Sequence, residues 1–324
     1  AAGRIHLGVT GTDLVRERLG RWQQRVEELA GLGFGQADLV LAVGTRLGPA
    51  DTTNENPELI DPSRQTLLQI DVEPKNASWS FPCECVMVGD AARVLAQLVE
   101  ALRAQGAPEA TELHSRRAAV GRVRAEQHFF DHPDYASDEV PIMPQRLFKE
   151  LRESIADDAL LTCDAGENRL FMTHYFQTKA AGTLLMPGIG AMGYAVPAAL
   201  AGKLVDPDRQ VLAVTGDGGF SMALNGMMTA RDENIPIVVV VLNNSALGWV
   251  KHGQGNRPIA SSFADMNFAD IARSIGCHGI RVEQPAAIAP ALREALSSGR
   301  PTVVDVVTSF KPSFRDVTSA LTQS

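Results

Sequence analysis

Two short polar motifs, Gly216-Asp217-Gly218 and Asn243-Asn244, are separated by 24 residues. Each motif follows a run of apolar, β-branched residues, and a helical pattern lies between them, so the stretch predicts a strand–helix–strand unit. In such a unit the carboxyl ends of both parallel strands lie at one edge of the sheet, which would place Asp217 beside Asn244. A carboxylate and a carboxamide oxygen in that position could bind Mg²⁺.

The glycines around Asp217 favour the approach of an anion. Gly216, Gly218 and Gly219 tolerate positive φ and leave the backbone accessible to a ligand. The helix that starts after them would direct its free N–H groups at that ligand. Metal ligands beside a helix N-terminus therefore predict a diphosphate site. The competing interpretation is that the glycines form an ordinary turn and the asparagines cap a strand.

A second glycine-rich segment, PGIGAMG, begins at Pro187. Its Gly188, Gly190 and Gly193 match the Gly-x-Gly-x-x-Gly pattern of dinucleotide-binding proteins. That pattern is expected directly after a strand and about twenty residues before an acidic residue. Here Pro187 interrupts the approach and Asp206 follows too early. An NAD- or FAD-binding oxidoreductase is therefore kept as an alternative function.

The motifs are predicted to lie on an α/β framework. Some runs are apolar at nearly every position, which is typical of strands covered on both faces in a parallel sheet. They are residues 38–45, 66–72, 85–88, 159–163, 210–215, 237–242 and 301–307. Helical spacing of apolar residues predicts amphipathic helices over 15–29 and, after Asp90 as N-cap, over 91–102. Strands alternating with helices indicate doubly wound parallel sheets.

A polar, charged segment divides this framework into two doubly wound parallel-sheet domains. We expect an N-terminal domain over residues 1–105, a linker over 106–143, a second domain over 144–310 and a C-terminal tail over 311–324.

Composition limits the class of partner. The net charge is −8 and the Lys and Arg residues are scattered, which argues against a nucleic-acid partner. Apolar runs fall short of the ~18 residues of a transmembrane helix, so no membrane span is expected. The four cysteines lack zinc-site spacing, which favours reduced thiols and a cytoplasmic location.

The spacing of the two polar motifs resembles the cofactor motif of thiamine-diphosphate-dependent enzymes, and the surrounding segments resemble the acetolactate synthase-like members. The resemblance implies that Mg²⁺ is held by Asp217, Asn244 and the backbone carbonyl of Ala246. The cofactor-binding residues that it implies are Gly190, Met192, Gly216, Asp217, Gly218, Gly219, Phe220, Asn244, Ala246, Leu247 and Gly248.

The implied contacts differ in role. The backbone of Gly218, Gly219 and Phe220 is expected to contact the phosphates. Met192 would support the bent shape of the cofactor, and the carbonyl of Gly190 would accept a hydrogen bond from the aminopyrimidine.

The resemblance also indicates candidate substrate-pocket residues, namely Glu167, Asn168, Trp249 and His252. Acetolactate synthases usually carry Gly-Gln-His-Gln in the first of these segments. This chain has Gly-Glu-Asn-Arg from Gly166 onward, so that histidine has no counterpart. A simple helix N-terminus, a core tryptophan and a solvated histidine are the respective alternatives.

The N-terminal residues resemble the family's middle domain, through segments such as ADLVLAVGTRL and LLQIDVEP. In acetolactate synthases this domain binds FAD. Gly44, Arg46 and Asp71 lie at strand ends where a nucleotide could bind, although an empty scaffold is favoured. Residues 1–105 are thus expected to be a partial, Rossmann-like middle domain, and residues 144–310 the thiamine-diphosphate-binding domain.

In the family, a pyrimidine-binding domain precedes the middle domain and supplies a catalytic Glu. We expect that domain to be absent from this chain, and Glu17 lies in no matching motif, so the catalytic residue stays unassigned. The implied protein is a 2-oxo acid decarboxylase or carboligase that forms a homodimer or homotetramer, and the isolated chain is expected to be inactive. A non-catalytic thiamine-diphosphate-binding subunit is the other alternative.

Overall fold

The computed structural model describes residues 5–8, 37–48, 52, 55–57, 59–106, 114–115, 117–119, 121–122, 131–188 and 190–313. The chain divides into two compact units, Ala1–Gln127 with Val317–Ser324, and His128–Asp316. The helix predicted over 15–29, most of the predicted tail and part of the predicted linker lie outside the described residues. The predicted domain boundaries therefore stay predictions.

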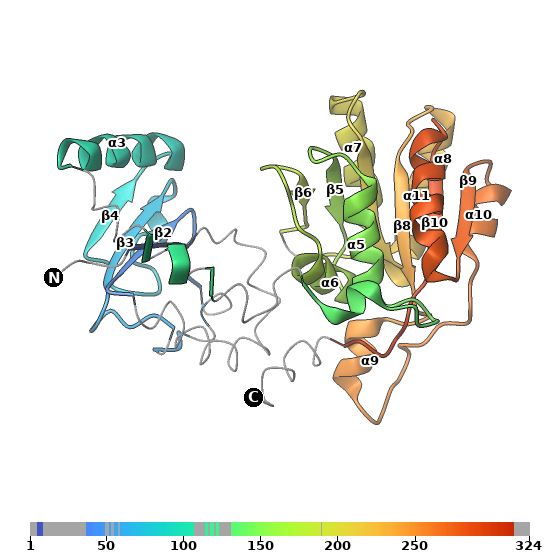
Figure 1. The fold of residues 1–324 in the computed structure, drawn as a ribbon, viewed down its shortest axis with the longest axis horizontal. Coiled ribbons are helices and arrows are strands. Elements are labelled where there is room, and N and C mark those ends of the chain that lie inside the picture. Colours follow the sequence, from blue (N-terminus) through green and yellow to red (C-terminus); the bar gives the residue numbers. More distant parts are fainter. Residues whose placement is uncertain are drawn as a thin grey trace. The chain divides into compact units, whose positions relative to one another are not determined.

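The first unit contains a parallel sheet with the strand order β1-β2-β3-β4 (Figure 1). Its strands are β1 (Ile5–Gly8), β2 (Leu39–Val43), β3 (Thr66–Asp71) and β4 (Cys85–Val88). A short 3₁₀ helix, η1 (Pro74–Asn76), follows β3, and α3 (Ala91–Ala104) follows β4. The side chain of Asp90 accepts a hydrogen bond from the Arg93 backbone N–H at 3.0 Å, which confirms the predicted N-cap.

The second unit contains a parallel sheet with the order β6-β5-β7-β8-β10-β9. Its strands are β5 (Leu160–Cys163), β6 (Leu184–Leu185), β7 (Val211–Gly216), β8 (Val238–Asn243), β9 (His278–Val282) and β10 (Thr302–Val307). The predicted strands are confirmed. The strands β6 and β9, which were not predicted, lie at the two edges, where a strand needs no continuous apolar run.

Helices cover both faces of the second sheet (Figure 1). The helices α7 (Ala195–Val205), α8 (Asp217–Asp232) and α10 (Phe268–Ser274) contribute to one hydrophobic core, in which the Phe220 and Phe268 rings meet edge to face at 5.3 Å. The helices α5 (Pro144–Ser154) and α11 (Ile288–Ser297) pack against each other on the other face. The strands between them are buried on both faces, which explains their apolar sequences.

Shorter elements complete the second unit. They are η2 (Pro133–Ala136), α6 (Glu167–Tyr175), α9 (Gly248–Gln254) and η3 (Pro285–Ala287). The chain passes from β5 outward to β6 and then returns to β7 on the other side of β5. The carboxyl ends of β5 and β7 therefore form a topological switch point, where open α/β sheets bind ligands.

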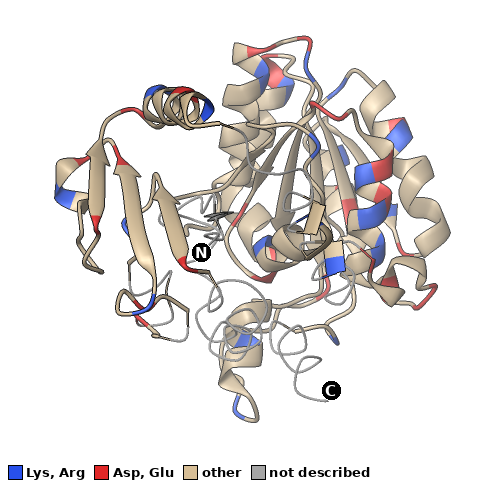
Figure 2. Ribbon diagram, turned by 60° about the vertical axis from the view of Figure 1, so that its left-hand side comes forward, with Lys and Arg blue, Asp and Glu red and all other residues tan. Residues whose placement is uncertain are grey.

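Basic and acidic residues are interspersed along the helices of the drawn chain (Figure 2). Among the helices that the structure describes, none combines the length and the apolar character that a membrane crossing requires.

Candidate functional site

A pocket with about 560 Å³ of open space lies at the carboxyl ends of β5, β7 and β8, at the switch point of the second sheet. It is lined by Ala165, Gly166, Glu167, Asn168, Phe171, Met192, Gly216, Asp217, Gly218, Gly219, Leu242, Asn244, Ala246, Leu247, Gly248, Trp249, Val250 and Thr308. The strand register explains why the two polar motifs meet here, because Gly216 of β7 is paired with Leu242 of β8. The residues that follow these two strands therefore lie side by side at the same edge of the sheet.

Asp217 is the first residue of α8 and is almost fully buried. Its carboxylate accepts hydrogen bonds from the backbone N–H groups of Gly218, at 2.7 Å, and of Ala246, at 3.1 Å. Burial raises the pKa of Asp217 from 3.8 to about 6, although these N–H groups act in the opposite direction. The structure thus places the Asp217 carboxylate directly against the loop that contains Asn244 and Ala246.

The loop after β8 has a fixed but unusual conformation. Ser245, between Asn244 and Ala246, has a φ of +56°, which is uncommon for a residue with a side chain. The loop is held by an isolated antiparallel bridge between Ala246 and Ser262, in which the Phe263 N–H donates to the Ser245 carbonyl at 2.8 Å. Such strain persists only where the surroundings enforce it, and it is frequent at functional sites.

The oxygen donors near Asp217 set the kind of metal that this pocket could hold. Within the described part of the chain, no group of three or more His, Cys, Asp and Glu side chains could hold a metal ion. Asp217 and Asn244 both line the pocket, so a metal held here would take one carboxylate together with neutral oxygen donors. One carboxylate with neutral oxygen donors suits Mg²⁺, which usually keeps several of its waters and takes ligand oxygens from a phosphate.

Gly218 forms a cradle in the pocket. A Cβ atom at this position would lie 2.7 Å from Cδ2 of Leu247 and 3.1 Å from Cε of Met192. The absence of a side chain therefore keeps space between two apolar residues that line the pocket. The neighbouring Gly219 has a different environment, because a Cβ atom there would overlap the Asp164 carboxylate and the Thr215 hydroxyl.

The first turn of α6 buries three successive polar side chains. Glu167, Asn168 and Arg169 are 5%, 7% and 2% exposed. The Asn168 amide donates to the Asp164 carbonyl at 3.1 Å, and the Arg169 guanidinium donates to the Pro187 carbonyl at 3.3 Å. The segment that lacks the histidine of acetolactate synthases is therefore an ordered part of the pocket wall.

Glu167 and His252 form a pair that the sequence did not predict. Oε1 of Glu167 lies 2.6 Å from Nδ1 of His252, and Nε2 of His252 lies 3.2 Å from the Phe310 carbonyl oxygen. The imidazole also stacks on the Phe310 ring at 4.0 Å. A Cβ atom on Gly248 would overlap the Glu167 carboxylate, so a glycine allows α9 to approach Glu167 closely. His252 is thus an anchor of α9 rather than a solvated side chain.

Glu167→Gln is expected to lower the free energy of unfolding by about 2 kcal/mol, because it removes a charged hydrogen-bond acceptor from a buried contact. With His252→Gln, a double-mutant cycle in urea should give a coupling energy of about 1–2 kcal/mol. The exposed pair of Lys311 and Glu139, 2.9 Å apart, is the control and should couple by less than about 0.5 kcal/mol. Equal coupling in the two pairs would contradict this interpretation.

The structure brings most of the predicted site residues into the pocket wall, but not all of them. Gly190, Phe220 and His252 are not among the lining residues. Gly190 is exposed with a φ of +69°, Phe220 is fully buried in the core, and His252 reaches the pocket only through Glu167. For Phe220 the side chain thus has a packing role, because this fourth residue of α8 belongs to the hydrophobic core.

Several lining residues were not predicted. They are Ala165, Gly166, Phe171, Leu242, Val250 and Thr308. Ala165 and Gly166 lie two and three residues after the end of β5, and Thr308 directly follows β10. Their positions at the carboxyl ends of strands are the signal that could have identified them.

The alternative dinucleotide pattern lies in an unsuitable place. The strand before Gly188 is β6, which has two residues and lies at the sheet edge. A dinucleotide fingerprint requires a strand inside the sheet that leads directly into a helix. A Cβ atom on Gly193, the third glycine of the pattern, would lie 3.4 Å from Cβ of Met222 in α8. This glycine therefore packs against a helix and not against a strand. This geometry disfavours the oxidoreductase interpretation.

The candidate nucleotide-site residues of the first unit are engaged locally. Gly44 follows β2 with a φ of +64°, and the Arg46 guanidinium lies 5.0 Å from the centre of the Trp79 ring. The Asp71 carboxylate accepts hydrogen bonds from the Glu73 N–H and the Asn76 amide, at 2.8 and 3.2 Å. The empty scaffold that the sequence favours, and the FAD site that it does not favour, both stay untested.

Two family models match the chain. The "Thiamine pyrophosphate enzyme, central domain" covers residues 16–98, and the "Thiamine pyrophosphate enzyme, C-terminal TPP binding domain" covers residues 164–306. The second range contains the whole of the Asp217 turn and the loop after β8. The chain therefore belongs to the thiamine pyrophosphate (thiamine diphosphate) enzyme family and contains its cofactor-binding domain.

Within this family, the chain is similar to acetolactate synthases. It is 31% identical to the acetolactate synthase isozyme 3 large subunit of Escherichia coli, over 88% of this chain and 50% of the relative. It is also 31% identical to the "Putative thiamine pyrophosphate-containing protein YdaP" of Bacillus subtilis, over 86% of this chain and 46% of the relative. The chain spans about half the length of the curated relatives it matches.

Proposed function

We propose that the second unit binds thiamine diphosphate together with Mg²⁺, and that residues 144–310 form the domain that does so. The observation that carries this proposal is the position of the Asp217 carboxylate, which accepts a hydrogen bond from Ala246 in the loop after β8. Asp217, the Asn244 side chain and the Ala246 carbonyl would hold the metal. Its charge would offset the buried carboxylate, whose pKa is raised to about 6.

Other residues of the pocket would bind the phosphates and the thiamine part of the cofactor. The N–H group of Gly219, in the first turn of α8, would bind a phosphate oxygen, whereas the Gly218 N–H already donates to the Asp217 carboxylate. Met192, 3.1 Å from a Cβ position on Gly218, would support the cofactor from its apolar side. Leu247 and Gly248 would border it from the loop after β8.

We further propose that the whole protein converts a small 2-oxo acid, as a decarboxylase or a carboligase, in a cytoplasmic homodimer or homotetramer. When bound, thiamine diphosphate supplies a carbon nucleophile and an electron sink for such reactions. The residues of this chain would bind and orient the cofactor and exclude water from it. Glu167, Asn168 and Trp249 are the candidates for the side of the pocket that meets the substrate, and His252 would act there only through Glu167.

Intrinsic fluorescence of the 324-residue chain should test cofactor binding directly, because Trp249 lines the pocket whereas Trp22 and Trp79 belong to the first unit. Thiamine diphosphate should change the emission only when Mg²⁺ is present, and a metal chelator should reverse the change. The same titration on Trp249→Phe should give no signal. A response to NAD⁺, or a response to thiamine diphosphate without Mg²⁺, would contradict the proposal.

The non-catalytic alternative is separated by a second measurement. Carbon dioxide release from a panel of 2-oxo acids is expected to be absent for this chain alone, because the catalytic Glu is assigned to no residue of it. Steady turnover by the chain would show that this expectation is wrong, while leaving the assigned cofactor site intact.

A further inference from the structure

The pocket has two halves that come from different parts of the chain. One half is the segment before α7, which contains Met192. The other half is formed by the Asp217 turn and the loop after β8. A ligand that touches both halves requires that their separation be fixed. The residues that fix it should lie outside the pocket, and two fully buried carboxylates have suitable contacts.

Asp164, directly after β5, is completely buried and connects the two halves. Its Oδ1 accepts hydrogen bonds from the backbone N–H groups of Tyr194 and Ala195, at 2.6 and 2.7 Å, and so caps α7. Its Oδ2 accepts a hydrogen bond from the Thr215 hydroxyl at 2.6 Å. Thr215 lies two residues before Asp217, and Tyr194 lies two residues after Met192.

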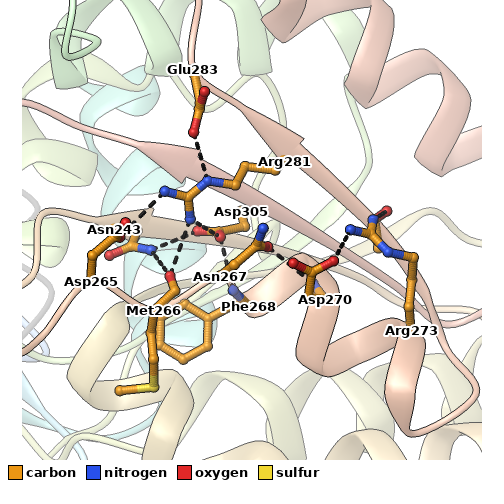
Figure 3. A network of polar contacts seen from close by, with 11 residues as sticks. Asn243, Asp265, Met266, Asn267, Phe268, Asp270, Arg273, Arg281, Glu283 and Asp305 are labelled. Atoms are coloured by element: carbon orange, nitrogen blue, oxygen red, sulfur yellow. Dashed lines mark hydrogen bonds and ion pairs between the residues drawn. The ribbon is translucent and has the colours of Figure 1, made fainter.

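Asp305 of β10 is also completely buried and holds only the second half (Figure 3). Its Oδ1 accepts a hydrogen bond from the Asn243 amide at 3.0 Å, and Asn243 is the last residue of β8. Its Oδ2 accepts hydrogen bonds from the Phe268 N–H at 2.9 Å and from the Arg281 guanidinium at 2.8 Å. These contacts fix the point at which the chain leaves β8.

The Asp305 network reaches the pocket by a second route. The Asn243 amide and the Arg281 guanidinium both donate to the Met266 carbonyl, at 2.7 and 3.1 Å (Figure 3). They thereby hold the segment that begins at Ser262, which is bridged to Ala246 of the loop after β8. The loop after β8 is thus fastened at its start and along its side by the same carboxylate.

We propose that Asp164 and Asp305 are positioning residues for separate parts of the cofactor site. Asp164 sets the Met192 segment at a fixed distance from the Asp217 turn. Asp305 fixes the position of the loop after β8, which contains Asn244 and Ala246. This inference rests on the proposed function. Its consequence is that loss of each carboxylate should impair the binding of a different portion of the same ligand.

Two probes separate the portions. Thiamine diphosphate would contact both halves of the pocket, whereas inorganic pyrophosphate with Mg²⁺ would engage only the Asp217 turn and the loop after β8. The ratio of the two dissociation constants therefore reports the placement of the Met192 segment. A general loss of stability would weaken both ligands together and would leave this ratio unchanged.

The experiment measures both dissociation constants by calorimetry for the 324-residue chain and its variants. Asp164→Ala should weaken thiamine diphosphate by about 10-fold or more and leave pyrophosphate nearly unchanged. Asp305→Ala should weaken both ligands by a similar factor of about 10-fold or more while its circular dichroism stays that of the folded chain, because unfolding alone would weaken them this much only if about nine tenths of the molecules were unfolded. Thr302→Val, which alters a fully buried hydroxyl at the amino end of β10, is the matched control and should change neither constant.

Conservative variants distinguish positioning from loss of fold. In Asp164→Asn the amide oxygen can still accept from Tyr194 and Ala195, and the amide nitrogen can donate to Thr215, so thiamine diphosphate binding should recover. If Asp164→Ala does not fold, Thr215→Val removes one arm of the network and should shift the ratio in the same direction. For Asp305 the corresponding milder variant is Asn243→Ala, which should weaken both ligands.

Three outcomes would overturn the inference. One is an Asp164→Ala or Thr215→Val chain in which both ligands weaken equally or neither weakens. Another is Asp305→Ala and Asn243→Ala chains that bind both ligands as the unaltered chain does. Failure of the unaltered chain to bind either ligand would instead refute the proposed function, and this inference with it.

Discussion

Asp217→Asn should reduce the affinity for thiamine diphosphate with Mg²⁺ by on the order of 100-fold, which corresponds to about 3 kcal/mol of binding free energy. Asp217 provides the carboxylate among the proposed metal ligands, and an amide oxygen carries no charge to offset that of the cation. The measurement is calorimetry at pH 7.5 with saturating Mg²⁺. Equal affinity in the two chains would show that the metal is held elsewhere.

The same substitution should remove most of the pH dependence of the stability of the ligand-free chain, although its amide nitrogen cannot accept the hydrogen bond that one Asp217 oxygen accepts from Gly218 or Ala246. Because burial raises the pKa of Asp217 above 3.8 to about 6, the folded state binds its proton more tightly than the unfolded state does. The contribution of this group to stability is therefore complete below pH 3.8 and is lost as the pH rises through about 6. Above that pH the buried charge costs about 3 kcal/mol, a cost that the neutral amide of Asn does not carry.

Urea denaturation between pH 4 and pH 8 would measure this effect. We expect the unaltered chain to lose stability relative to Asp217→Asn over that range, with the difference levelling off above about pH 7. Asp232→Asn, at the opposite end of α8, changes an exposed carboxylate and should alter neither stability nor affinity. Parallel pH profiles of stability in the two chains would show that Asp217 does not titrate as a buried carboxylate.

This opposition between stability and binding is expected of a preorganised site. The N–H groups of Gly218 and Ala246 hold the Asp217 carboxylate in place before any ligand arrives, yet burial makes its charge unfavourable. The positive φ of Ser245 has the same character, because it is a local strain that the surrounding structure enforces. The buried charge of Asp217 therefore lowers the stability of the ligand-free chain, and a bound cation would offset that charge.

The central strands and the meeting of Asp217 with the loop after β8 were predictable from the sequence for a local reason. Strands buried on both faces leave continuous apolar runs, and parallel pairing of β7 with β8 brings their carboxyl ends to one level. Edge strands have no such signature. The strand β9 contains His278, Gly279 and Arg281 among its five residues, and a pattern of that kind does not separate a strand from a loop.

The pair of Glu167 and His252 was not predictable, because 85 residues separate its members and no spacing rule connects α6 with α9. Asp164 and Asp305 were not assigned a role for a related reason. Each follows or lies within an apolar strand, and its partners are backbone N–H groups and side chains from other elements. Sequence identifies residues that could contact a ligand, whereas the residues that position them depend on tertiary packing.

Alanine should have different effects at the two adjacent glycines of α8, lowering stability at Gly219 and cofactor affinity at Gly218. Gly219→Ala should lower the free energy of unfolding by about 3 kcal/mol or more. Its Cβ would overlap the Asp164 carboxylate and would lie 2.6 Å from the Thr215 hydroxyl oxygen. Both groups are completely buried and are hydrogen-bonded to each other, so neither can move away without breaking that bond.

Gly218→Ala should instead fold, with a change of less than about 1 kcal/mol in urea denaturation, because its Cβ meets the ends of flexible side chains and alanine favours the helix. The Cδ2 of Leu247 and the Cε of Met192, 2.7 and 3.1 Å from that Cβ position, would have to move into the pocket. The displaced side chains would occupy the space proposed for thiamine diphosphate, so its affinity should fall by about 10-fold or more. Gly253→Ala, whose Cβ would meet nothing within 4 Å, is the control for both measurements. Unchanged affinity in a folded Gly218→Ala chain would show that the cofactor does not bind beside Gly218.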